Sequence, residues 1–90
     1  MTTAYDVRVT GRVQGVFFRS YVAEQAELLG VTGWVRNEPD GSVAGHFEGD
    51  TAPVVTLVER CKEGPPQARV EHVDARPAEV TGATRFDVRH

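Results

Sequence analysis

Cysteine and long hydrophobic stretches are scarce in this 90-residue chain. Cys61 is the only cysteine, so no internal disulfide can form, which favours a reducing compartment or indifference to the redox state. No apolar stretch approaches the roughly 20 residues that a membrane-spanning helix needs. The first residues also lack the basic and hydrophobic regions of a signal peptide. We therefore expect a cytoplasmic protein with no membrane partner.

The chain also lacks an excess of positive charge. Its formal net charge is −3, and Lys62 is the only lysine. Nucleic-acid binders need a basic surface, so we expect no nucleic-acid partner. Four arginines nevertheless lie in or beside the two motif segments described below. They could form a small positive funnel for an anionic substrate or be ordinary solvated residues at strand ends: Arg8, Arg12, Arg19 and Arg36.

Length and composition are those of one globular domain spanning residues 1–90. The chain is 40% hydrophobic and 26% charged, without repeats or a linker. A chain of this length buries over ~60% of its unfolded surface, enough for one core. We expect a monomer.

Hydrophobic periodicity predicts five strands. Residues 5–10 alternate apolar and polar side chains, as in a half-buried strand. Residues 31–37 and 42–48 are expected to be strands joined by the turn Pro39-Asp40-Gly41. Residues 69–74 and 86–89 complete the set, with a loop over residues 78–84.

Two helices are predicted between these strands. The first covers residues 20–29 and should end at Gly30. The second follows Asp50 or Thr51, either of which could cap its N-terminus, and should end at Gly64. Its apolar stripe includes Cys61, which is therefore expected to be buried.

The order of elements is β-α-β-β-α-β plus a short C-terminal strand. Each helix has one apolar stripe, so both should cover one face of a single sheet. Right-handed crossovers then give an α+β, ferredoxin-like split β-α-β sandwich.

The most informative segment covers residues 11–19 and reads GRVQGVFFR. A glycine-containing loop between a strand and a helix N-terminus can direct several backbone N–H groups at one anion. Arg19 adds a forked guanidinium that matches two phosphate oxygens. A cation is unfavourable in the first turn of a helix, so a bound anion explains Arg19 better than solvation does. The alternative is a hairpin-like turn with a surface arginine.

A second segment, residues 33–43, reads GWVRNEPDGSV. Asn37 lies at the end of the incoming strand, just before the turn. Asparagine at such a place is often only a turn residue. Its amide can, however, orient a water molecule, because it is both a donor and an acceptor.

Together the two segments resemble the acylphosphatase family. The match covers Val9 to Arg19 and Gly33 to Gly49, and extends more weakly to residues 85–89. The resemblance implies the ferredoxin-like fold and hydrolysis of acyl phosphates. It also implies that Arg19 is the catalytic arginine and that Asn37 is the second catalytic residue, which positions the attacking water.

The loop between the first strand and the first helix, here called the binding loop, is expected to bind substrate through backbone N–H groups. Its residues are Gln14, Gly15, Val16, Phe17 and Phe18. Gly15 would allow close approach of the substrate. Phe17 and Phe18 cannot both face the core, so one of them is expected to form a wall of the site.

Other polar residues have weaker patterns. Glu38 stands where some family members have a hydroxyl residue, and its carboxylate would repel phosphate unless it points away. His46, His72 and His90 are too scattered for a metal or catalytic site and are expected on the surface. No cluster of Asp, Glu and His has metal-ligand spacing, so we expect no metal and no cofactor.

A site without a nucleophile, a metal or an obvious general base limits the chemistry. An acyl phosphate suits it, because the carboxylate leaves without protonation and positioning plus electrostatic stabilisation can suffice. One alternative is a non-catalytic phosphoanion-binding or regulatory module of the same fold. Another is a small RNA-binding domain, which the negative charge and the lack of stacking aromatics disfavour.

Overall fold

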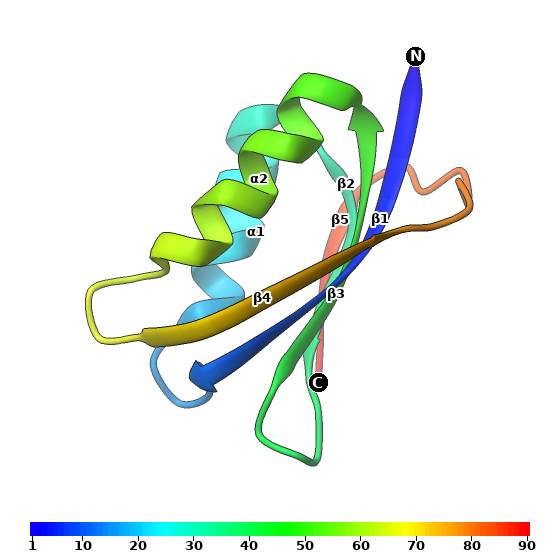
Figure 1. Ribbon diagram of the computed structural model, residues 1–90. Coiled ribbons are helices and arrows are strands. Elements are labelled where there is room, and N and C mark those ends of the chain that lie inside the picture. Colours follow the sequence, from blue (N-terminus) through cyan, green and yellow to red (C-terminus); the bar gives the residue numbers. More distant parts are fainter.

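The computed structural model describes residues 1–90 as one five-stranded sheet with both helices on one face (Figure 1). The elements are β1 (Thr2–Arg12), α1 (Phe18–Leu29), β2 (Thr32–Asn37), β3 (Val43–Asp50), α2 (Thr51–Glu63), β4 (Arg69–Pro77) and β5 (Phe86–Arg89). The strand order is β4-β1-β3-β2-β5. All neighbours are antiparallel except β2 and β5, which are parallel. The predicted α+β sandwich is thus confirmed, and β5 takes the edge beside β2.

Both helices end at the glycines that the sequence predicts, Gly30 and Gly64. Gly30 has φ 72°, a left-handed conformation, and its N–H lies against the carbonyls of Ala26 and Glu27. Gly64 follows the last residue of α2. The predicted side-chain cap of α2 is wrong, because Asp50 is the N-cap but its carboxylate accepts no capping hydrogen bond. Neither helix, at 12 and 13 residues, is long enough to cross a membrane.

The core lies between the sheet and the helices. The predicted stripe of α2 is buried there, including Cys61, and burial raises the pKa of that thiol to about 12. The core is filled mostly by valines of the strands, together with larger side chains from the sheet and from the helices. They include Val7, Val9, Val35, Val43 and Phe47 of the sheet and Phe18, Val22, Val54, Leu57 and Cys61 of the helices.

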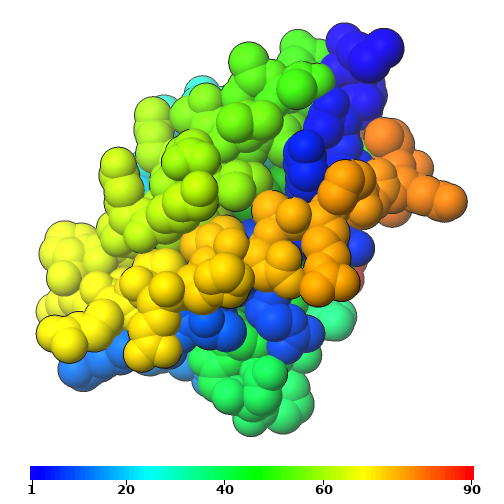
Figure 2. Space-filling view, in the orientation of Figure 1, coloured from blue at the N-terminus to red at the C-terminus, as the bar shows by residue number.

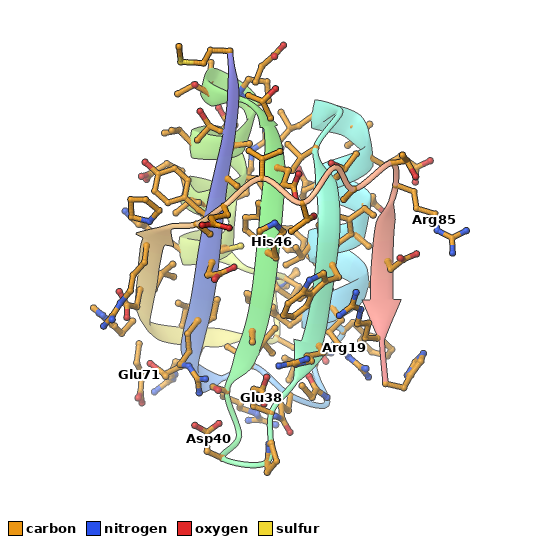
Figure 3. All side chains as sticks on the ribbon, turned by 90° about the vertical axis from the view of Figure 1, so that its right-hand side faces the viewer. Arg19, Glu38, Asp40, His46, Glu71 and Arg85 are labelled. Carbon is orange, nitrogen blue, oxygen red and sulfur yellow. The ribbon has the colours of Figure 1, made fainter.

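The segment of residues 78–85, called the crossing segment here, connects the two edges of the sheet. It leaves β4, which lies along the surface in Figure 2, and runs to β5 at the opposite edge. On the way it passes over the face that the helices leave uncovered, the open face (Figure 3). The carbonyl of Arg85 accepts a hydrogen bond of 2.9 Å from Gly33 N–H. This places the start of β5 beside the start of β2.

His46 is buried, so the prediction of a surface histidine is wrong. The residue is 5% exposed, although strand alternation places it on the open face. Its Nδ1 lies 2.7 Å from Asp6 Oδ1, and its Nε2 lies 2.6 Å from Glu48 Oε2. Burial alone lowers the pKa of His46, but the hydrogen bonds to the two carboxylates outweigh burial and raise it.

Glu48 is buried beside His46 and fastens the crossing segment. Its carboxylate accepts hydrogen bonds from Thr81 N–H at 2.9 Å, from the Thr81 hydroxyl and from Gly82 N–H at 3.1 Å. Burial would raise the pKa of Glu48, but these bonds and His46 outweigh it and lower the pKa to about 2. The crossing segment therefore explains the burial of both residues.

Candidate active site

The binding loop contains two left-handed residues. Gly15 has φ 72°, and Phe17, with φ 63°, is the only non-glycine residue of positive φ. A left-handed residue followed by a right-handed one turns successive N–H groups toward the same side. Phe17 is also the N-cap of α1, and its carbonyl accepts from Tyr21 N–H at 3.1 Å. The N–H groups of the next residues have no partners within the helix and are available to an anion.

A cavity of about 230 Å³ lies at this helix end. Its lining residues come from the binding loop, the first turn of α1 and the end of β2: Val13, Gly15, Phe17, Phe18, Arg19, Ser20 and Asn37. The structure thus brings Arg19 and Asn37 together with three of the five residues of the binding loop. Val16 instead points into the core, and Gln14 does not line the cavity.

One of the two neighbouring phenylalanines is buried and the other is exposed, as the sequence predicts. Phe18 is 2% exposed in the core, whereas Phe17 is 76% exposed and lines the cavity. One phenylalanine therefore packs and the other forms a wall of the site.

Arg19 lies in the first turn of α1, at the end of the sheet seen at the bottom of Figure 3. Its Nη1 donates to the carbonyl oxygen of Arg89 at 2.8 Å and lies 3.3 Å from His90 Nδ1. None of the protein's ion pairs includes Arg19. A guanidinium has five N–H donors, so this one keeps its charge and several donors for a ligand.

Asn37 has an unusual side-chain oxygen. Its Oδ1 is the only buried side-chain polar atom that has no hydrogen-bond partner. An unpaired buried acceptor costs about 1–3 kcal/mol, so such atoms are few in native proteins and each needs an explanation. Because Asn37 lines the cavity, its oxygen is suited to accept a hydrogen bond from something bound there.

Gln14 has a side-chain role that the sequence analysis missed. Its Nε2 donates to the carbonyl oxygens of Glu38 and Ser42, each at 2.8 Å. These carbonyls stand at the two ends of the turn after Asn37, so the amide joins the binding loop to that turn. The contact spans 24 and 28 residues, and no short-range pattern announces it.

Glu38 does not line this cavity. Its Oε1 accepts from Arg36 Nε at 2.7 Å, and both residues line a separate cavity of about 630 Å³ on the open face. Arg8 lines that second cavity too and pairs with Asp40 at 3.0 Å. The predicted positive funnel therefore does not include Arg8 and Arg36, because each forms an ion pair outside the Arg19 cavity. Arg12 is exposed and does not line the Arg19 cavity.

The remaining histidines follow the prediction. His72 and His90 are exposed. No three His, Cys, Asp or Glu side chains gather in an arrangement that could hold a metal ion.

Comparisons with known proteins show the family and the fold of this chain. The family model described as Acylphosphatase matches residues 5–88. An acylphosphatase of Nocardioides sp. is 55% identical over 99% of this chain and 90% of the relative. One from Rubrobacter xylanophilus is 56% identical over 98% of this chain and 81% of the relative. The crystal structure of acylphosphatase from Bacillus subtilis, 34% identical, superposes over the full length of both chains with a TM-score of 0.95. The chain belongs to the acylphosphatase family.

Proposed function

We propose that this protein hydrolyses acyl phosphates to a carboxylate and inorganic phosphate, with Arg19, Asn37 and the binding loop as the site. Acylphosphatase activity follows from relatives that are 55% and 56% identical over nearly the whole chain. The observation that carries the residue roles is one cavity that holds both an arginine without an acidic partner and the unpaired Asn37 oxygen.

Arg19 and the binding loop would hold the phosphoryl group. Gly15, Phe17 and Arg19 line the cavity in which its non-bridging oxygens would lie, so their N–H groups and the guanidinium would be the donors. Such fixed donors stabilise the charge that spreads over these oxygens in the transition state. The bond to the Arg89 carbonyl fixes the orientation of the guanidinium before substrate binds.

Asn37 would position the attacking water. Its Oδ1 accepts a hydrogen bond from the water, which lies in line with the bond to be broken. The water oxygen forms a bond to phosphorus while the bond from phosphorus to the acyl oxygen breaks and its electron pair leaves with the carboxylate. The proton of the water passes to a phosphoryl oxygen, so no side chain has to act as a general base.

The cavity favours this leaving group over an alcohol. An alkoxide needs a general acid, and no Asp, Glu or His lines the cavity. A carboxylate is a stable anion that departs without a proton. The site therefore suits acyl phosphates better than phosphate monoesters.

The test is release of inorganic phosphate from acetyl phosphate, with ethyl phosphate, whose leaving group is an alkoxide, as the matched monoester. We expect hydrolysis of acetyl phosphate at an equal rate with and without EDTA, and little hydrolysis of the monoester. Activity that disappears with EDTA and returns with one divalent ion would refute the metal-free mechanism. Phosphate binding without any turnover would support the non-catalytic module instead.

Two further expectations accompany the proposal. The chain is proposed to act as a monomeric single domain and to work in the cytoplasm. Sedimentation equilibrium tests the first expectation, and localisation of the tagged protein in cells tests the second.

A further inference from the structure

The last residues of β5 have few contacts that hold them in place. The strand has four residues and lies at the edge of the sheet, so β2 is its only neighbour. Its first half is partly buried, and the ring centroid of Phe86 lies 6.0 Å from that of Phe47. Its second half, Val88 and Arg89, is exposed. The carbonyl that accepts from Arg19 at 2.8 Å belongs to this second half, so the orientation of Arg19 depends on the least buried part of the strand.

The side chain of Arg89 lies in an unfavourable place. In the register of β2 and β5 it is opposite Arg36, and like charges directly opposite each other on neighbouring strands are destabilising. None of the protein's ion pairs includes Arg89. Its guanidinium carbon Cζ instead lies over the ring of Trp34, 4.7 Å from the ring centroid. This ring is therefore the contact that compensates the position of Arg89.

Trp34 contacts both arginines. It lies on β2 two residues before Arg36, whose Cζ is also 4.7 Å from the ring centroid. The negative face of an aromatic ring attracts cations, so the ring offsets the repulsion between the two guanidiniums. Arg36 has a second partner in Glu38, at 2.7 Å, whereas Arg89 has no acidic partner and depends on the ring. At an exposed site such a contact changes an equilibrium by about two- to fivefold.

We propose that Trp34 and Arg89 are positioning residues, whose contact holds the end of β5 so that the Arg89 carbonyl orients Arg19 for the phosphoryl group. The proposal rests on the proposed function. Neither Trp34 nor Arg89 lines the cavity of Arg19, so both act through the main chain of β5 and not on the substrate. A looser strand end would have to be ordered each time a phosphoryl group binds. That cost falls equally on the ground state and the transition state, so it raises KM and leaves kcat unchanged.

The test is a double-mutant cycle of Arg89→Ala and Trp34→Leu, with KM and kcat for acetyl phosphate and inhibition by inorganic phosphate as measurements. Each single variant should raise KM and the inhibition constant of phosphate by about two- to fivefold, with kcat unchanged. The double variant should be no worse than either single variant, because both changes remove the same contact. Arg89→Lys keeps a cation for the ring and should retain most of the native affinity.

The fluorescence of Trp34, the only tryptophan, gives a second measurement that needs no turnover. If the contact favours phosphate binding, phosphate binding must favour the contact by the same factor. Inorganic phosphate should therefore change the emission of the native protein, with the same constant that inhibition gives. Arg89→Ala should abolish this change. Because Arg89 is exposed, this variant should fold, so the test is decisive even where Trp34→Leu does not fold.

Arg85→Ala is the matched control. Arg85 lies just before β5 and pairs with Asp87 at 3.0 Å, so its removal takes away a positive charge near β5 without touching the ring contact. It should leave KM and the emission change unaltered.

Additive effects of Arg89→Ala and Trp34→Leu would assign Arg89 to direct attraction of the anion and would overturn the proposal. Unchanged constants and an unchanged emission response in Arg89→Ala would also overturn it, while leaving the hydrolase function intact. A native protein that binds phosphate but does not hydrolyse acetyl phosphate would instead overturn the proposed function.

Discussion

The Arg19 guanidinium donates a hydrogen bond of 2.8 Å to the main-chain carbonyl of Arg89, which joins the first turn of α1 to the end of β5. The two residues are 70 positions apart in the chain. The contact is possible because β5 runs parallel to β2 and ends beside it, with Arg36 opposite Arg89. The C-terminal strand thus orients the arginine of the candidate site.

Replacement of Arg19 by alanine should remove most of the activity. Arginines in phosphoryl-transfer sites contribute about 10³–10⁵ in rate, and we expect a loss of kcat/KM in that range. Arg19→Lys should recover little, because an ammonium group has no planar fork for two phosphate oxygens. Phosphate release and competitive inhibition by inorganic phosphate measure the effect. Arg12→Ala is the matched control, and near-native turnover by folded Arg19→Ala would contradict the assignment.

The two hydrogen bonds of the Gln14 amide should stabilise the binding loop, and a substitution can test this. Gln14→Glu is isosteric but replaces the donor, so a carboxylate would face the carbonyl oxygens of Glu38 and Ser42. We expect a loss of about 1–3 kcal/mol of stability and weaker binding of inorganic phosphate. Urea denaturation and phosphate inhibition measure the two effects. Gln67→Glu, an exposed control, should change neither, and an unaltered Gln14→Glu protein would mean that the loop needs no tie to the turn.

Sequence reasoning located the residues of the candidate site that depend on local chain geometry. Arg19 follows a glycine loop at a helix start, and Asn37 ends a strand before a turn, so both could be located from neighbours a few residues away. Their meeting in one cavity follows from the predicted fold. The bond from Arg19 to Arg89 was not predictable, because the position of a four-residue strand in the sheet has no local signal.

His46 shows a second limit of the same reasoning. Strand alternation correctly assigns it to the face opposite the core, and an outer face is normally solvated. Here the crossing segment covers that face through Thr81 and Gly82, which bond to Glu48. A loop without periodicity carries no sign of where it lies. The one available hint was a histidine and a glutamate two residues apart on one strand face.

The pair of His46 and Glu48 should give the stability of the protein a defined pH dependence. The pKa of His46 is raised, so its contribution is complete below about 6.5 and is lost as pH rises through the higher folded value. The pKa of Glu48 is lowered to about 2 from 4.5, so its contribution is present above 4.5 and is lost as pH falls toward 2. The free energy of unfolding should decline on both sides.

Urea denaturation across pH 3–9 measures this profile, with pH values chosen around the ordinary pKa of histidine, about 6.5. His46→Gln should be less stable at neutral pH and should lose the decline on the alkaline side. His72→Gln is the control, because His72 is exposed and should leave the profile unchanged. An alkaline decline that persists in His46→Gln would assign it to another group.

Phe17 should also show the cost of its backbone conformation. In the left-handed region glycine has no Cβ clash, so Phe17→Gly should be more stable than Phe17→Ala by about 1 kcal/mol. At Leu28, within α1, the order should reverse, because glycine is about 1 kcal/mol worse than alanine in a helix. Thermal or urea unfolding of the four variants gives both differences. The same order at both positions would argue against strain at Phe17.

Replacement of Asn37 should distinguish binding of phosphate from catalysis of hydrolysis. Its Oδ1 accepts no hydrogen bond from the protein, so Asn37→Ala breaks no internal bond to that atom. Removal of an unpaired buried acceptor relieves its desolvation cost, so the stability of the protein should not fall. Turnover should nevertheless fall by about 10²–10³, the usual effect of losing one well-placed polar group. Phosphate affinity should persist, because Arg19 and the binding loop are unchanged.

The measurements are kcat for acetyl phosphate, inhibition by inorganic phosphate and thermal unfolding, all on Asn37→Ala. Asn37→Asp adds a second comparison, because it keeps an acceptor for water but places a negative charge in the cavity with the phosphoryl group. It should therefore weaken phosphate binding, which Asn37→Ala should not do. If stability, affinity and turnover of Asn37→Ala fall together, Asn37 is a structural residue of the turn. If turnover alone is lost, the water-positioning role stands, because a turn residue could not stop hydrolysis while leaving both the fold and the phosphate site intact.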